Sequence, residues 1–253
     1  MSRTANKSER SAALLMTLLT APFIGCSGAE TEPNAAVDPD QPPVTGNCVP
    51  GAETSDPFAD CIDAFSPGPG ATFGHSALPD IVLGAPVPGA GGGGGMDVAS
   101  LGCGGTITLM FDGEGLQDRD GDDLIVFENP FATGDTTFAE PAQVLVSDDG
   151  DTWYGFGCEP SGDGSWPPVG CAGVSVVAPS DGDFDPGSAG GDRFDLADVG
   201  LASARYVRLV DVTEAHYGDS IWCAGSAGGF DLDAVAAATT WPAALSRQPP
   251  EPR

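Results

Sequence analysis

The sequence is that of an acidic, loop-rich chain. Its 253 residues include only 9 Lys and Arg against 37 Asp and Glu, for a formal charge of -28, together with 37 glycines and 23 prolines. Nucleic acids and anionic lipid headgroups are therefore poor partners, because both require basic protein surface. Hydrophobic residues still make up 41% of the chain, so we expect one folded domain with tails.

The first 26 residues predict an export signal. Three basic residues precede the short apolar run SAALLMTLLTAPFIG, which ends just before Cys26. This run is too short, and too soon interrupted by Pro22, for a membrane-spanning helix. FIGC resembles a bacterial lipobox, with Phe23 where Leu is usual, which implies lipidation of Cys26; ordinary signal-peptidase cleavage is the alternative. Ser27 resembles the pattern of outer-membrane lipoproteins, so we expect a lipid anchor at the cell envelope as the only membrane contact.

Cleavage before Cys26 would leave 6 basic and 36 acidic residues and no lysine. Residues 27–58 are rich in Pro and acid, which predicts a disordered tether. We expect the folded domain over residues 59–240 and a polar tail over residues 241–253.

Six cysteines remain beside Cys26, and an even number in an exported chain favours disulfides. Fifteen connectivities are possible, and free buried thiols are the alternative. A zinc site is disfavoured because the chain has no CxxC pair and only two histidines. Short loops favour two pairs, Cys48 with Cys61 and Cys158 with Cys171, which leaves Cys103 with Cys223.

The expected strands begin in a glycine-rich stretch, where IVLG at residues 81–84 is the first candidate. Residues 106–111 alternate apolar and polar side chains, as a half-buried strand does. Residues 124–127, LIVF, are apolar throughout and suit a central strand buried on both faces.

A hairpin is the clearest local feature, since the runs QVLVS and TWYGFG flank an Asp-Gly turn. Further strands are expected at residues 173–178, 204–213 and 229–238. Helical periodicity long enough for a core helix is absent from the sequence between Cys61 and Trp241. Many short strands separated by Gly, Pro and Asp turns predict an all-β fold, an antiparallel β-sandwich of jelly-roll type.

Motifs along this domain resemble two protein families. SDDGDTW, ARYVRL and the terminal FDLDAV resemble the discoidin and galactose-binding-like superfamily. LGCGGTITLMF, VFENPF, EPAQVLVSDDG, GGDRFDLADVGL and GFDLDAV resemble a family of bacterial cell surface proteins, exported and often lipid-anchored. The resemblance implies a galactose-binding-like jelly roll at the cell surface. In such modules a structural calcium ties the first and last parts of the sandwich together.

An acidic loop between two expected strands is the main metal candidate. It crowds four carboxylates into six residues: Asp118, Asp120, Asp122 and Asp123. These carboxylates repel one another, and few Lys or Arg residues are available to compensate. Ca²⁺ is the simplest counter-charge, although the loop departs from an EF-hand, with Gly121 fourth and Asn129 twelfth. A solvated acidic turn is the alternative.

A second acidic loop, DGDFDPGSAGGD, places carboxylates at alternate positions: Asp181, Asp183 and Asp185. The spacing of its acidic residues is closer to that of a calcium-binding loop. A flexible loop without a metal is the alternative.

Acidic residues also interrupt apolar strands, where an isolated buried carboxylate is costly. The resemblance to galactose-binding-like modules makes three of them further calcium ligands: Glu128, Asp231 and Asp233. Pairing with Arg205 or Arg208 is the alternative.

Aromatic side chains in loops suggest a ligand surface, because sugar-binding sandwiches use such rings as stacking platforms. The candidates are Trp166, Tyr217 and Trp222, with Trp166 expected to be exposed. Packing in a core or hairpin is the alternative for Trp153 and Trp222.

Catalysis has little support in the sequence. GDSI at residues 218–221 imitates a lipase-like signature, but no histidine follows it and His216 precedes it. We therefore expect a non-catalytic, calcium-stabilised surface module that binds a glycan or another surface protein. The alternatives are a structural envelope component and, less favoured, a hydrolase that uses Ser220 and His216.

Overall fold

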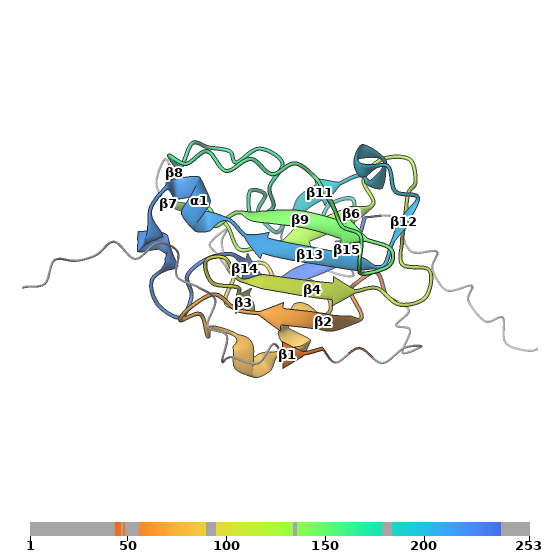
Figure 1. Cartoon of the computed structure of the whole chain (residues 1–253), viewed down its shortest axis with the longest axis horizontal. Helices are drawn as coiled ribbons and strands as arrows, with labels where there is room; N and C mark the ends of the chain where they lie inside the picture. The colour runs from red at the N-terminus through yellow and green to blue at the C-terminus, as the bar shows by residue number, and fades with distance from the viewer. Residues whose placement is uncertain are drawn as a thin grey trace, which may run out of the picture. The chain divides into compact units, whose positions relative to one another are not determined.

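The computed structural model describes residues 44–46, 48, 56–89, 95–133, 136–178 and 184–238 (Figure 1). All of them belong to one unit of the chain, Val37–Arg253. The predictions of a signal peptide, of lipidation at Cys26 and of a tail over residues 241–253 fall outside the described residues, as does most of the tether.

The larger sheet is antiparallel and has the strand order β1-β2-β4-β13-β9-β10. Its strands are β1 (Val44–Thr45), β2 (Cys61–Ser66), β4 (Thr106–Met110), β9 (Ala142–Ser147), β10 (Tyr154–Gly155) and β13 (Tyr206–Asp211). Figure 1 shows β2, β4, β13 and β9 side by side in this order. In β13, Val207 and Leu209 are fully buried whereas Tyr206, Arg208 and Val210 are half-buried, so its side chains alternate between the core and the outer face.

The smaller sheet has the order β11-β6-β15, with β11 (Asp192–Phe194), β6 (Leu124–Phe127) and β15 (Ala234–Ala237). Every residue of β6 is buried, as its apolar sequence predicts. Leu124 and Val126 join the core that the two sheets share, whereas Ile125 and Phe127 pack with Phe58 in a second cluster. Burial of such a side chain stabilises the fold by roughly 1.5–3 kcal/mol.

Shorter elements complete the described residues. Three strand pairs are β5 (Leu116–Gln117) with β12 (Ser203–Ala204), β3 (Ala99–Ser100) with β14 (Asp231–Leu232), and β7 (Phe131–Thr133) with β8 (Thr136–Phe138). The helical turns are η1 (His75–Ala77), η2 (Asp80–Val82), η4 (Leu196–Val199), α1 (Thr213–Tyr217) and η5 (Ser220–Cys223). The fold is thus mostly antiparallel strands, and the one described α-helix has five residues. None of the described helices is long and apolar enough to cross a membrane.

Two expected strands are wrong. The IVLG run at residues 81–84 begins inside the 3-10 turn η2, and only Val82 of that turn is buried. Residues 173–178 form no strand; their only bridge joins Val177 to Gly190. Both are apolar runs without a long strand to pair with, so hydrophobicity alone misled the prediction. The expected hairpin is present, because β9 pairs with β10 across the Asp-Gly turn.

Three disulfides join Cys48 to Cys61, Cys158 to Cys171 and Cys103 to Cys223. The first two are the pairs that short loops favour, and the third is the pair that these two leave. The expected tether over residues 27–58 needs a correction at its end. Val44 and Thr45 pair with β2, and Phe58 is buried against β15. The domain therefore begins before residue 59, because the strand partner of β2 lies in this proline-rich segment.

Candidate functional site

The first candidate site is an outer acidic cluster made of Asp118, Asp123 and Asp195. One carboxylate oxygen from each lies within 4.8 Å of the others. Asp123 is only 1% exposed, and its two oxygens accept hydrogen bonds from the Arg119 N–H at 2.9 Å and the Leu196 N–H at 3.0 Å. Burial raises the pKa of Asp123, and the charges of Asp195 and Asp118 add to this effect. Such a set of oxygens suits a hard cation.

The other acids of this loop do not join the cluster. Asp120 is exposed, and Asp122 lies 3.7 Å from the guanidinium of Arg193, so a basic residue supplies one counter-charge after all. Asp195 was missed because it lies in the distant motif FDLAD and caps η4 through the Ala197 N–H at 2.8 Å. The pairings of β6 with β11 and of β5 with β12 bring that motif to the loop.

Of the three acids predicted as ligands in the second acidic loop, only Asp185 is among the described residues. Asp181 and Asp183 lie outside the described residues. Asp185 accepts hydrogen bonds from the Gly187 N–H at 3.1 Å and the Ser188 hydroxyl at 2.8 Å. These bonds lower its pKa and close its own turn. Asp185 thus stabilises a local turn, without a second described carboxylate of that loop beside it.

The acids predicted inside strands do not pair with arginine. Arg205 donates to the Gly113 carbonyl at 2.8 Å. Arg208 donates to the Thr108 hydroxyl at 3.0 Å and covers the ring of Trp153 at 3.8 Å. The alternative of Arg205 or Arg208 as the counter-charge is therefore wrong. Trp153 therefore packs within the hairpin region, which was the alternative to a role in ligand binding.

Asp231 and Asp233 lie two residues apart in the motif FDLDAV, but their side chains have different surroundings. Asp233 accepts from the Val87 N–H with both oxygens, at 3.2 and 3.0 Å. Burial, with a contribution from Asp97, raises the pKa of Asp233 to about 7. Asp231 accepts a hydrogen bond from the Ser100 hydroxyl, and burial raises its pKa to about 6. The two carboxylates thus bond to different segments, the backbone at Val87 and the side chain of Ser100.

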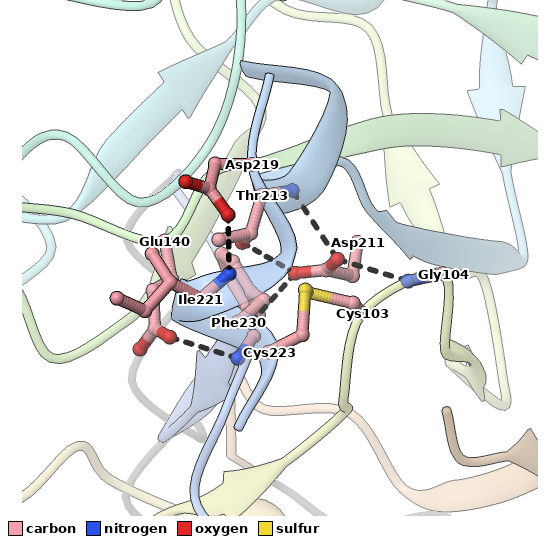
Figure 2. Close-up of a disulfide and its surroundings, with 10 residues drawn as sticks. Cys103, Gly104, Glu140, Asp211, Thr213, Asp219, Ile221, Cys223 and Phe230 are labelled. Carbon is pink, nitrogen blue, oxygen red and sulfur yellow. Dashed lines mark hydrogen bonds between the residues drawn. A yellow bond between two sulfur atoms is a disulfide. The ribbon is translucent and has the colours of Figure 1, made fainter. Parts of the chain in front are cut away.

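Three further carboxylates are buried: Glu140, Asp192 and Asp211. Asp192 ends the second predicted acidic loop, whereas Glu140 and Asp211 were not singled out from the sequence. Asp192 accepts from the N–H groups of residues 173, 174 and 175. Asp211 accepts from the Phe230 N–H at 2.7 Å, the Gly104 N–H at 3.0 Å and both donors of Thr213 (Figure 2). Asp211 lies at an inward position of β13, and an acid at such a position is the signal that could have found it; Glu140 lies before β9 and carries no such signal.

Glu140 lies beside the same segment. Its carboxylate accepts from the Gly229 N–H at 2.8 Å, next to Phe230 and close to the Cys103–Cys223 disulfide (Figure 2). Burial raises the pKa of Glu140 to about 9, and the nearby charges of Asp231 and Asp211 add to the rise.

Three partly exposed rings, those of Phe138, Tyr217 and Trp222, pack together and are called the aromatic platform. The ring centroids of Tyr217 and Trp222 are 5.0 Å apart, and those of Phe138 and Trp222 are 5.2 Å apart. Tyr217 donates its hydroxyl to the Ala139 carbonyl at 2.7 Å, and the disulfide at Cys223 holds the turn that carries Trp222. Trp222 is 39% exposed, so it is not a core residue.

Trp166 is 47% exposed, as expected, in the loop closed by Cys158 and Cys171. That loop reaches the platform, because a Cβ added to Gly164 would lie 2.8 Å from the Tyr217 ring. Two of the three predicted ligand aromatics are therefore in contact, and the third belongs to a loop that touches one of them.

The serine and histidine considered for hydrolysis are not arranged as a pair. His216 is 1% exposed, and its Nδ1 lies 3.2 Å from the Ser161 hydroxyl. Ser220 is exposed at the start of η5. Burial lowers the pKa of His216.

Comparison with known proteins adds no assignment. The chain matches no protein-family model and no curated protein. The resemblance to bacterial cell surface proteins stays a prediction from the motifs.

Proposed function

We propose that this chain is a non-catalytic binding module of the bacterial cell surface, exported and lipid-anchored, built on a galactose-binding-like jelly-roll sandwich. Its ligand surface is the aromatic platform, its ligand is a glycan, and calcium at the outer acidic cluster stabilises the fold. The antiparallel sheets with a common core, the disulfides and the export signal predicted from the sequence support this class of protein.

The observation that carries the proposal is the exposed Trp222 against Tyr217 and Phe138. Aromatic faces stack on the apolar faces of sugar rings, and a rigid platform loses little entropy on binding. Tyr217 is fixed by its hydroxyl and Trp222 by the adjacent disulfide, so the platform is preorganised. Exposed polar groups of Asp163 and Ser165, in the loop that carries Trp166, supply hydrogen-bonding partners beside it.

The outer acidic cluster supports the calcium part of the proposal. Asp118, Asp123 and Asp195 present oxygens at mutual distances compatible with one ion, and the Asp122–Arg193 ion pair leaves them without a basic partner in the described salt bridges. A cation there would join the acidic loop to η4, and thus β6 to β11.

A glycan array tests the ligand class, with the full chain assayed in calcium and in EDTA. We expect binding in calcium, weaker binding in EDTA, and at least about tenfold loss in Trp222→Ala, which corresponds to about 1.4 kcal/mol. Tyr154→Ala is the matched control, because Tyr154 is equally exposed at 40% but lies on the edge strand β10. No binding by the wild type in either buffer would remove glycans from the proposal.

A second candidate is a subunit of a surface protein assembly. Ile221, next to Trp222, is 66% exposed, and an aliphatic side chain beside an aromatic platform favours a protein partner. A stoichiometric partner recovered from envelope extracts, and lost with Ile221→Ser, would favour this candidate over glycan binding.

A further inference from the structure

Exposed acidic side chains border the aromatic platform. Asp219 caps the turn η5, where its carboxylate accepts a hydrogen bond from the Ile221 N–H at 2.9 Å, next to Trp222 (Figure 2). Glu214 lies on α1 together with Tyr217. Both acids are exposed, so each presents a carboxylate to solvent. The segment that carries two of the three platform rings is therefore also acidic.

A third acid reaches the platform from the loop closed by the Cys158–Cys171 disulfide. The backbone of Gly164 lies against the Tyr217 ring, and its N–H donates to the His216 carbonyl at 2.8 Å. Asp163, the residue before Gly164, is exposed and accepts hydrogen bonds from the Ser165 hydroxyl at 2.5 Å and the Ser165 N–H at 3.0 Å. These bonds lower the pKa of Asp163, so its carboxylate is ionised at neutral pH.

Positive charge does not balance these acids within the described part of the chain. The described arginines lie in the acidic loop, in β11, before β13 and within β13: Arg119, Arg193, Arg205 and Arg208. The one described contact between a cation and a ring is that of Arg208 with Trp153, outside the platform. His216, next to Tyr217, is buried, and burial lowers its pKa and favours its neutral form. The platform is thus a set of aromatic rings with carboxylates beside it.

On the basis of the glycan function proposed above, we propose that the platform binds a cationic sugar, a glycan of hexosamine units with free amino groups. The apolar face of the sugar ring would stack on Trp222, and its ammonium groups would meet Asp163 and Asp219. Aromatic faces attract a cation as well, so the rings and the acids favour the same ligand. A uronic acid would bring its own carboxylate against these acids and be repelled. A neutral sugar would make the stacking contact alone.

Three tetrasaccharides with one linkage type isolate the effect of charge: those of glucosamine, of N-acetylglucosamine and of glucose. Calorimetric titration of the full chain in calcium, at about pH 6 so that the amines are protonated, measures their affinities. We expect glucosamine to bind at least about fivefold more tightly than the other two, and to lose most of this advantage at high salt. Equal or weaker binding of glucosamine overturns the inference and leaves the glycan proposal standing. Absence of binding by all three overturns both.

Asparagine variants remove the charges and keep the hydrogen bonds. In Asp163→Asn with Asp219→Asn the side-chain oxygens still accept from Ser165 and Ile221, so the loop and the turn η5 keep their local structure. We expect this double variant to bind the glucosamine tetrasaccharide about fivefold more weakly than the wild type does. The affinities for the two uncharged tetrasaccharides should not change. An unchanged affinity for glucosamine overturns the inference.

A matched control is needed because a chain with a formal charge of -28 attracts any polyamine. Asp148→Asn with Asp151→Asn makes the same change of net charge at exposed acids of the β9–β10 hairpin. This control should bind glucosamine as the wild type does, whereas Trp222→Ala should lose at least about tenfold. An equal loss in the control, or full binding by Trp222→Ala, would show unspecific attraction and overturn the inference.

A tetrapeptide of lysine tests the other cationic occupant, a basic segment of a partner protein. We expect it to bind more weakly than the glucosamine tetrasaccharide, because a lysine side chain has no rigid ring face to stack on Trp222. Tighter binding of the peptide, lost in Trp222→Ala, would overturn the inference in favour of a protein partner.

Discussion

Glu140→Gln should change how the stability of the calcium-free domain depends on pH. In an unfolded chain the pKa of this glutamate is 4.5, whereas burial near Asp231 and Asp211 raises the pKa to about 9 in the fold. Between these values the folded state holds a proton that the unfolded state has lost. Stability is therefore fully present below pH about 4.5 and falls as pH rises toward 9.

The size of the effect follows from the shift. One pKa unit corresponds to about 1.4 kcal/mol, so Glu140 alone should lower the free energy of unfolding by about 3 kcal/mol between pH 4.5 and pH 7. Asp231 and Asp233 have pKa values raised to about 6 and about 7, and they add losses of the same sign. A glutamine remains neutral and keeps an oxygen for the Gly229 N–H, so it should remove the contribution of Glu140.

Urea unfolding at several pH values, with calcium removed, measures this directly. We expect Glu140→Gln to match the wild type near pH 4.5 and to be more stable by up to about 3 kcal/mol at pH 7. Glu159→Gln, at an exposed glutamate, is the control and should follow the wild-type profile. If the stability of Glu140→Gln falls with pH as steeply as that of the wild type, Glu140 is not buried in the way described.

Three other substitutions test the packing around the site. Asp211→Ala should destabilise by more than about 3 kcal/mol in urea unfolding, because it leaves several buried donors unpaired at about 1–3 kcal/mol each; a loss below about 1 kcal/mol would contradict those hydrogen bonds. Gly191→Ala should cost clearly more than Gly121→Ala in thermal unfolding: both have positive φ, but only at Gly191 would a Cβ lie 2.7 Å from a side-chain carbon of β6. Equal costs would refute that close approach. Cys103→Ser with Cys223→Ser opens a link across 120 residues and should lower stability by about 4 kcal/mol and weaken platform binding; unchanged binding would show that the disulfide does not position Trp222.

Strands and turns were predicted correctly where the pattern of apolar and polar residues within a short segment decides its structure. The alternation in residues 106–111, the apolar run LIVF and the Asp-Gly turn gave β4, β6 and the β9–β10 hairpin. The strands β2 and β11 were missed for two reasons. DRF in β11 has a single apolar residue, and the apolar residues of CIDAFS in β2 do not alternate because a bulge shifts its register between Ile62 and Ala64. Their burial comes from partners far away in the chain.

The candidate site was predictable only in part for the same reason. Charge crowding singled out Asp118 and Asp123, whose carboxylates lie close together, but Asp195 is far away in the sequence and reaches them through strand pairing, as of β6 with β11. Glu140 and Asp211 were not distinguished from surface acids, since burial of a carboxylate depends on tertiary packing. The exposed Trp166 was predicted from its place in a disulfide-closed loop, a purely local feature.

Calcium-dependent thermal unfolding of the full chain tests the central claim most directly. If acidic sites of this domain bind calcium, the metal-stripped chain should melt at a lower temperature than the calcium-loaded chain. Calcium at 100 times its dissociation constant should add about 2.7 kcal/mol per site, which raises Tm by several degrees. An identical Tm in EDTA and in saturating calcium would contradict the account.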